Sequence, residues 1–370
     1  MKWSFLVVLA ALVTACGGQP IAANASDDAG EDVVQEVTLA DTATAETAED
    51  AQADVPDASA DVPLPVCPSP VIDVLEGDEV VPQTVLHIKG DQSVAGSGAT
   101  IAGYKWTVKQ PTGSMQTFLP SATYADPTFV ANVGGEYTFC LDVTDNNGLS
   151  ACTPACVTVT VIPTDELHIE LVWDTPADPD QTDRGPALGA DMDLHFANNL
   201  AKVADTDCDG APDPWFNNPF DCFWFNQAPQ WGKADPTVLD DPTLGMDDTD
   251  GAGPENLNLA QPEGTVAVPH WYAIGVHYKN DNGFGVSYAT VVVYAFGAIA
   301  LQVAKVPMKM LDMWYVGKLN WPNQLTGTST PPLDICYQTT GSKPGDVCAG
   351  NAKMWQPKGE WCITPKYATP

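Results

Sequence analysis

The chain has 370 residues, with 48 Asp and Glu against 15 Lys and Arg and a formal net charge of -33. Hydrophobic residues make up 44% of the chain and the mean hydropathy is -0.09, which favours a soluble globular body with room for two ordinary domains. This excess of carboxylates argues against electrostatic binding to nucleic acid or anionic lipid and favours cations as partners.

Residues 1–15 have the pattern of a signal peptide, because Lys2 precedes an apolar run from Phe5 to Val13 that is too short to span a bilayer. The sequence Val13-Thr14-Ala15-Cys16-Gly17-Gly18 resembles a bacterial lipobox, with Val13 where Leu is commoner. The resemblance implies a lipid on Cys16 and, with Gly17 following, sorting to the outer membrane or cell surface. A chance cysteine after an ordinary signal core is the alternative.

The segment 16–65 has the composition of a disordered linker. From residue 17 to residue 65 it has twelve acids, no aromatic residue and no Lys or Arg. It cannot bury enough apolar surface to offset the entropy of ordering, and self-repulsion extends it beyond the ~40 Å expected of a flexible coil. We expect a lipid-anchored acidic tether that holds the folded part off a membrane; an acidic interaction tail is the alternative.

Nine cysteines besides Cys16, with no CxxC pair, predict disulfides formed in an oxidising compartment. The turn signal Asp145-Asn146-Asn147-Gly148 separates strand-like segments at 136–144 and 152–162. Since Cys140 and Cys152 lie symmetrically about Asn146, we expect them to pair, which leaves Cys67 with Cys156. Further along, we expect Cys208 to pair with Cys222, and two of Cys336, Cys348 and Cys362 to pair, with one thiol left over.

Residues 66–163 show the alternation of a β-sandwich of about a hundred residues. One face of each predicted strand is apolar: Tyr104, Trp106 and Val108; Tyr137, Phe139, Leu141 and Val143; Val157, Val159 and Val161. The stretches Gly103–Val108 and Gly135–Gly148 resemble the Trp strand and the ending of the PKD (polycystic kidney disease) domain. Its usual acidic turn is replaced by Lys109-Gln110-Pro111, and the disulfides are a further departure. The resemblance implies an extracellular spacer or a module that contacts protein or glycan, without catalysis.

Residues 164–370 predict a second antiparallel sandwich, which makes the fold class all-β. Leu167, Ile169, Leu171 and Trp173 alternate with polar residues, and strands are expected at 271–278, 286–296 and 299–303 with a turn at Asn282-Gly283. The stretches 171–174, 190–196, 247–256 and 289–294 are similar to a β-sandwich domain of uncharacterised secreted bacterial proteins. That resemblance implies a fold and export, not an activity.

The negative charge is concentrated between residues 174 and 250, where seventeen Asp and no Glu face three basic residues. So many carboxylates repel one another unless they are solvated, protonated or neutralised by a cation. Short Asp side chains in Gly- and Pro-rich loops suit Ca²⁺, which takes oxygen ligands in irregular geometry, whereas zinc prefers thiolate and imidazole clusters that this chain lacks. We therefore expect structural Ca²⁺.

Three groups of residues are the candidate ligands. Asp205, Asp207, Asp209 and Asp213 follow the D-x-D-x-D-G-x-x-D pattern and resemble EF-hand and thrombospondin type 3 loops, with Phe216 where those loops place Glu. Asp191 and Asp193 alternate with His195 on one face of a strand, opposite Met192, Leu194 and Phe196. The third group is Asp247, Asp248, Asp250 and Glu255. The alternative is that all are surface aspartates in turns, and His195 is expected to be structural.

Seven aromatic residues lie between Trp215 and Trp231. They predict either a stacking surface for sugars or apolar partners, or a small core beneath a loop held by Cys208 and Cys222. We favour the small core. The exposure of the rings separates the two hypotheses.

The sequence assigns no catalytic residue, because it lacks the zinc-protease, nucleophile-elbow and phosphate-loop motifs. We expect a non-enzymatic, surface-displayed lipoprotein whose calcium-stabilised sandwiches serve adhesion, with an extracellular protein or polysaccharide as partner and no nucleic acid. One alternative is a calcium-dependent hydrolase built on Asp191, Asp193 and His195. The other is a structural subunit of an envelope complex.

Overall fold

The computed structural model describes residues 66–182, 188–203, 213–235, 237–265, 267–268, 270–321 and 363–367, and the backbone of 334–336. The predictions for 1–65, for Asp205, Asp207 and Asp209, and for Cys348 and Cys362 lie outside these residues. The regular elements of the described part are strands, so the all-β fold is confirmed, and this part holds no helix suited to crossing a membrane. Pro65–Pro370 forms one compact unit, and the boundary at 163/164 stays a prediction.

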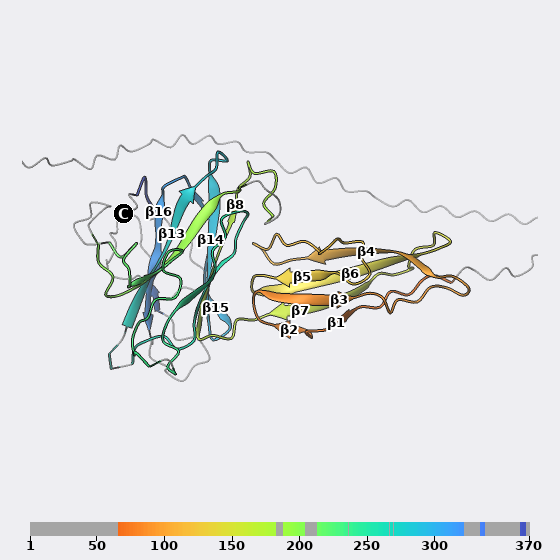
Figure 1. Ribbon diagram of the computed structural model, residues 1–370, viewed down its shortest axis with the longest axis horizontal. Coiled ribbons are helices and arrows are strands. Elements are labelled where there is room, and N and C mark those ends of the chain that lie inside the picture. Colours follow the sequence, from red (N-terminus) through yellow and green to blue (C-terminus); the bar gives the residue numbers. More distant parts are fainter. Residues whose placement is uncertain are drawn as a thin grey trace, which may run out of the picture. The chain divides into compact units, whose positions relative to one another are not determined.

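The first sandwich has a three-stranded and a four-stranded sheet, drawn in orange to yellow-green in Figure 1. The three-stranded sheet has the order β1 (Asp73–Val74), β3 (Thr84–Lys89), β5 (Thr128–Ala131). The four-stranded sheet has the order β2 (Glu79–Val80), β7 (Ala155–Val161), β6 (Gly135–Asp145), β4 (Ile101–Lys109). Pairing is antiparallel except between β2 and β7.

The predicted alternation builds the core of this sandwich. Tyr137, Phe139, Leu141 and Val143 of β6 are at most 1% exposed, and they pack with Trp106 of β4 and Phe129 of β5. The predicted turn is confirmed as well. Gly148 has a positive φ of 82°, and its N–H donates to the carbonyl of Asp145.

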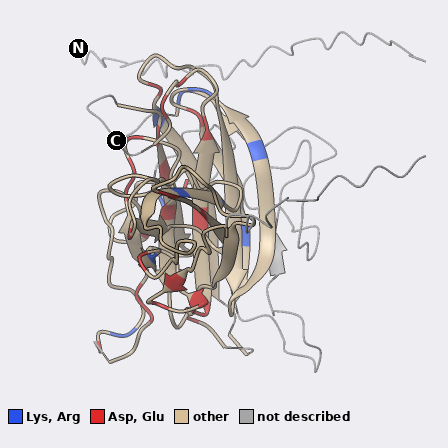
Figure 2. Cartoon of the chain, turned by 90° about the vertical axis from the view of Figure 1, so that its right-hand side faces the viewer, with Lys and Arg blue, Asp and Glu red and all other residues tan. Residues whose placement is uncertain are grey.

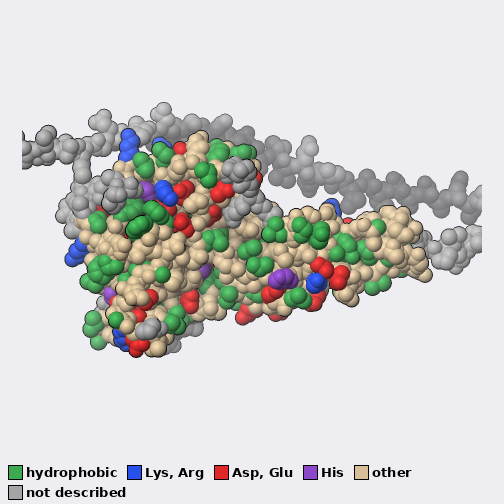
Figure 3. Space-filling model, viewed as in Figure 1, with side chains coloured by type: hydrophobic (Ala, Val, Ile, Leu, Met, Phe, Trp, Pro, Cys, Tyr) green, Lys and Arg blue, Asp and Glu red, His purple; other side chains and the backbone are tan. Residues whose placement is uncertain are grey.

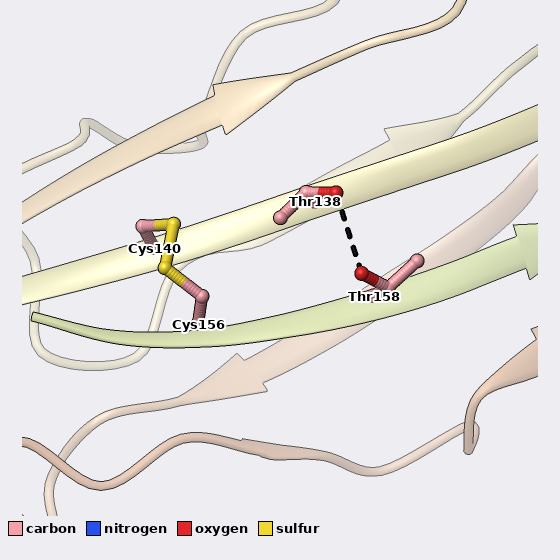
Figure 4. Close-up of a disulfide and its surroundings, with 4 residues drawn as sticks. All are labelled: Thr138, Cys140, Cys156 and Thr158. Carbon is pink, nitrogen blue, oxygen red and sulfur yellow. Dashed lines mark hydrogen bonds between the residues drawn. A yellow bond between two sulfur atoms is a disulfide. The ribbon is translucent and has the colours of Figure 1, made fainter.

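The predicted disulfide pairing of the first sandwich is wrong. The bridges are Cys67–Cys152 and Cys140–Cys156. Cys140 and Cys156 are direct cross-strand partners of β6 and β7, next to the hydrogen bond between Thr138 and Thr158 (Figure 4). The symmetry argument failed because strand pairing is not continuous beyond the isolated bridge between Thr144 and Ser150. Cys152 lies in the loop after this bridge, and β7 begins only at Ala155.

The second sandwich has a five-stranded and a six-stranded sheet, drawn in green to blue in Figure 1. The five-stranded order is β11 (Thr243–Met246), β12 (Glu255–Leu259), β8 (Leu167–Asp174), β14 (Ser287–Ala295), β15 (Ala298–Met308). The six-stranded order is β10 (Asp221–Cys222), β9 (Asp191–Asn198), β13 (His270–Asn280), β16 (Met313–Trp321), β17 (Asp334–Cys336), and β18 (Ile363–Thr364) also pairs with β16. The strands expected at 271–278, 286–296 and 299–303 are confirmed, whereas β16 was not predicted.

Strand β9 is buried on both of its faces. Met192, Leu194 and Phe196 point into the core between the sheets, as predicted. The opposite face, with Asp193 and His195, is covered by aromatic side chains that include Trp215. Trp215 fits closely because β13 has Gly275 below it, where an added Cβ would come within 2.6 Å of the indole.

The predicted bridge between Cys222 and Cys208, which lies outside the described residues, is not formed. Cys222 is a free, buried thiol, and its Sγ lies 3.5 Å from the carbonyl oxygen of Gln227. Burial raises the pKa of this thiol. Cys222 belongs to the apolar core between the sheets, which also includes Trp231.

Candidate functional site

Three carboxylates from distant parts of the second sandwich converge at one point. Asp193, Asp247 and Glu255 each offer an oxygen, and these oxygens lie within 4.8 Å of one another. Asp193 belongs to β9, Glu255 opens β12, and Asp247 directly follows β11. With the neighbouring Asp191 they form what we call the acid centre. The centre joins residues that the sequence had placed in two separate groups.

Part of one edge of β9 has no neighbouring strand, and a side chain of the other sheet binds there. β10 pairs only with Phe196 and Ala197, so the N–H of Leu194 has no strand partner on that edge. The Oε2 atom of Glu255 accepts a hydrogen bond from this N–H. The bond fixes the Glu255 carboxylate against β9 and leaves its other oxygen directed elsewhere.

The acid centre is buried and its hydrogen bonding is incomplete. Asp193 and Glu255 are 0% exposed and Asp191 is 6% exposed. Four carboxylate oxygens there accept no hydrogen bond: Asp191 Oδ1, Asp193 Oδ1, Asp247 Oδ1 and Glu255 Oε1. A buried polar atom without a partner costs about 1–3 kcal/mol, and more when it is charged, so these oxygens call for a further group.

Protonation is one way to relieve the repulsion in the centre. Burial, together with Asp193 and Asp247, raises the pKa of Glu255 well above its usual range. Burial and Asp193 raise the pKa of Asp191 to about 6. A divalent cation is the other way, because Ca²⁺ bound at about 2.3–2.6 Å spans oxygen separations of this size.

Two side chains of β13 contact the carboxylates of the acid centre. Lys279 Nζ lies 3.1 Å from Asp191 Oδ2, and His277 Nδ1 lies 3.4 Å from Asp193 Oδ2. Partial burial lowers the pKa of Lys279, but the carboxylates of Asp193 and Asp191 outweigh it, and the net pKa is raised. Burial lowers the pKa of His277. Of these two side chains only the Lys279 ammonium is therefore charged at neutral pH, and the sequence had not indicated either of these residues.

Asp248 and Asp250 lie near the acid centre in sequence but bind backbone instead. Asp248 accepts the N–H groups of Asp250 at 3.0 Å and Gly253 at 2.8 Å. Asp250 accepts the N–H of Gly189 at 2.8 Å. These contacts match the turn alternative. Asp213 is buried at 4% exposure and is not among the converging carboxylates.

His195 belongs to a separate buried pair. Its Nδ1 lies 2.7 Å from Oδ2 of Asp221, and both side chains are 0% exposed. Burial raises the pKa of Asp221, although His195 opposes that shift. The imidazole stacks on Phe223 at 5.0 Å, so aromatic rings enclose the pair. No spacing in the sequence links these two residues, and only the pairing of β10 with β9 brings them together.

The aromatic cluster divides into a buried and an exposed part. Trp215, Phe223 and Trp231 are at most 4% exposed, as the small-core hypothesis predicts, whereas Trp224 is 36% and Phe225 66% exposed. The exposed part lines what we call the aromatic pocket, with a volume of about 410 Å³. Its lining residues are Phe216, Asn218, Phe223, Trp224, Phe225, His277 and Lys279.

Acidic side chains outnumber basic ones over the described part of the chain. Figure 2 shows Asp and Glu in strands and loops, with few Lys and Arg among them. On the face drawn in Figure 3, acidic side chains adjoin hydrophobic ones and basic side chains are scattered. A patch suited to a polyanion is therefore not visible on that face.

The fold and sites define an all-β protein with a disulfide-bonded sandwich and a second sandwich that carries a buried acid centre. Residues 78–161 match the family model described as K319L-like, PKD domain. This part of the chain is a PKD-like β-sandwich, as the sequence resemblance implied. A search of curated proteins finds no match.

Three solved structures are similar to parts of the chain. The PKD1 domain of the Vibrio cholerae metalloprotease PrtV is 24% identical over 26% of this chain and 98% of that chain, with a TM-score of 0.20. A structure from work on carbohydrate-binding modules of the β-sandwich superfamily is 16% identical over 63% of this chain and 97% of that chain, with a TM-score of 0.22. The Escherichia coli adhesin FdeC is 16% identical over 65% of this chain and 63% of that chain, with a TM-score of 0.16. With TM-scores this low, these likenesses carry no argument about function.

Proposed function

We propose that the chain is a non-enzymatic, surface-displayed lipoprotein whose calcium-stabilised β-sandwiches contact glycan or protein at the cell envelope. The lipid on Cys16 and the acidic tether 16–65 would attach it to the outer membrane. Two disulfides support an oxidising location outside the cytoplasm. The PKD-like sandwich supports a role in display or contact.

The acid centre is the observation that carries this proposal. The oxygens of Asp193, Asp247 and Glu255 converge, while Lys279 pairs with Asp191. The unpartnered oxygens of the two fully buried carboxylates, Asp193 and Glu255, need a cation or a proton. Ca²⁺ accepts 6–8 oxygens in irregular geometry, whereas Mg²⁺ demands near-octahedral geometry at about 2.0–2.1 Å and keeps several waters. Because the acid centre is buried, it fits Ca²⁺ better than Mg²⁺, which keeps several waters.

A calcium-dependent hydrolase is the second candidate, because a histidine paired with a carboxylate is the orienting half of hydrolytic triads. The His195–Asp221 pair has that form. Both residues are 0% exposed beneath Phe216 and Phe223, which favours a structural role. Hydrolysis of glycans or peptides by the wild type, but not by Asp221→Asn, would establish the hydrolase instead.

Thermal melting of the wild type and Glu255→Gln, in Ca²⁺ and in chelator, tests the calcium centre. In the wild type, Ca²⁺ at ten times its Kd adds about 1.4 kcal/mol to the free energy of unfolding. Glu255→Gln loses this gain. In chelator the variant melts above the wild type, because Gln removes the cost that Glu255 adds to folding, whether as a buried charge or through uptake of a proton. Its amide oxygen still accepts the Leu194 N–H.

Asp250→Asn is the matched control, because Asp250 binds backbone outside the acid centre and Asn keeps an oxygen for the Gly189 N–H. Its response to Ca²⁺ should equal that of the wild type. A wild type that melts at the same temperature with and without Ca²⁺ contradicts the calcium centre. Equal responses to Ca²⁺ in the wild type and Glu255→Gln place any bound ion elsewhere.

A further inference from the structure

The walls of the aromatic pocket are two rings that the sandwich leaves exposed. The Trp224 and Phe225 rings have centroids 5.6 Å apart and planes at 73° to each other, which forms a corner. Phe223 supports both from behind, at 6.1 Å and 6.3 Å. Adjacent large apolar side chains held open on the surface of a soluble domain mark an interaction site.

The pocket also has polar groups that a ligand can use. His277 is 1% exposed, and its Nε2 is buried without a hydrogen-bond partner. Asn218 and Lys279 lie in the same lining. A hydroxyl group of a ligand would supply the partner that the imidazole lacks, because hydroxyls both donate and accept.

The pocket does not require a charged ligand. Lys279 is already paired with Asp191 at 3.1 Å, and its Nζ lies 4.6 Å from the centroid of Trp224, where it holds the indole in place. Residues 66–370 carry 36 acids against 14 bases, so the surrounding potential repels anions. An uncharged ligand avoids that repulsion.

The pairing of β13 on both of its edges excludes an extended peptide bound by strand addition. β13, which supplies His277 and Lys279, is paired on one side with β9 and on the other with β16, so it offers no free edge. The volume of about 410 Å³ lies in the ordinary range for pockets that take compact ligands. A sugar ring fits such a site, because its C–H faces lie against aromatic faces while its hydroxyls point to the polar groups.

We propose that the aromatic pocket binds an uncharged oligosaccharide, with Trp224 and Phe225 as stacking walls and His277 and Asn218 as hydrogen-bonding groups. This inference names the ligand class of the contact function proposed above and rests on it. The pocket is then the recognition site, and Lys279 connects it to the acid centre.

Binding of the full chain to an array of neutral and acidic glycans tests the inference, followed by calorimetry with the neutral oligosaccharide that binds best. Trp224→Ala should weaken binding at least about tenfold, and Phe225→Ala should weaken it as well. Trp224→Phe keeps a ring in the corner and should retain most of the affinity. Tyr124→Ala is the matched control, because Tyr124 is 57% exposed in the first sandwich and should not affect binding.

Absence of binding to any neutral glycan overturns the inference, and so does a preference for acidic glycans or unchanged affinity in Trp224→Ala. All variants are also melted with and without Ca²⁺. A normal calcium response without glycan binding defeats only the pocket. Glycan binding that depends on Trp224, in a protein that does not respond to Ca²⁺, defeats only the calcium part of the proposed function.

Discussion

At the scale of single residues, Glu263 shows how crowded carboxylates change protonation away from the acid centre. Its Oε1 is buried and accepts no hydrogen bond, and its Oε2 lies 3.5 Å from Nδ1 of His270. Burial, together with Asp240 and Asp241, raises the pKa of Glu263. Burial also lowers the pKa of His270, so the imidazole offers no charge to offset the carboxylate at neutral pH.

This shift predicts a loss of stability as pH rises. A raised pKa means that the folded state holds the Glu263 proton more tightly than the unfolded state, so the free energy of unfolding falls from the unperturbed pKa of 4.5 upward through the raised value. Glu263→Gln removes this term. The variant should therefore lose less melting temperature than the wild type between about pH 4 and about pH 7.5.

Calorimetric melting at the two pH values measures the difference. Glu136→Gln, which changes an exposed acid on β6, is the control and should follow the wild type. If Glu263→Gln shows the same pH dependence as the wild type, Glu263 does not hold its proton more tightly in the folded state.

At the scale of elements, sequence patterns predict strands but not their register. The alternation of Tyr137, Phe139 and Leu141 is sufficient to define β6, because each second residue is buried. The cysteine partners depend on where the hairpin closes, and the early bridge at Thr144 and Ser150 is not encoded in that alternation. β16 escaped prediction because polar residues interrupt its apolar ones without a strict period.

The acid centre shows the same division. The sequence indicates Asp193 and Glu255 because each lies in a cluster of acidic residues, but it groups each with its neighbours along the chain. In the structure two of those neighbours, Asp248 and Asp250, bind backbone, while residues from β9 and β12 meet across two sheets. Sandwich topology determines that meeting, and no local pattern carries it.

The two disulfides lead to a prediction about the first sandwich. Cys67–Cys152 joins residues 85 apart, whereas Cys140–Cys156 joins residues 16 apart. In the chain-entropy model the longer loop gives about 4.6 kcal/mol and the shorter about 3.1 kcal/mol. The double variant C67S/C152S should therefore lower the free energy of unfolding about 1.5 kcal/mol more than C140S/C156S.

The comparison is a matched one, because each bridge joins one exposed and one half-buried cysteine and neither lies in the core. Denaturant unfolding of both double variants gives the two free energies. The reverse order would contradict the entropic account and would show that the cross-strand bridge contributes through packing of β6 against β7.

At the scale of the whole molecule, two kinds of negative charge oppose folding. Residues 66–370 carry 36 acids against 14 bases, and most of these charges are dispersed over strands and loops (Figure 2). Their mutual repulsion acts through solvent, where salt screens it over about 30 Å at 0.01 M and about 3 Å at 1 M. The acid centre is buried, so salt screens it much less.

Sodium chloride and calcium chloride should therefore act on different charges. Raising NaCl from about 0.01 M to about 0.5 M should raise the melting temperature of the wild type and of Glu255→Gln by similar amounts, because the dispersed charge is the same in both. At matched ionic strength, CaCl₂ should add a further increase in the wild type alone, since only an intact acid centre binds the ion. If NaCl and CaCl₂ have equal effects at equal ionic strength, screening of the dispersed charge explains the whole response. An additional calcium effect that persists in Glu255→Gln would instead come from carboxylates outside the acid centre.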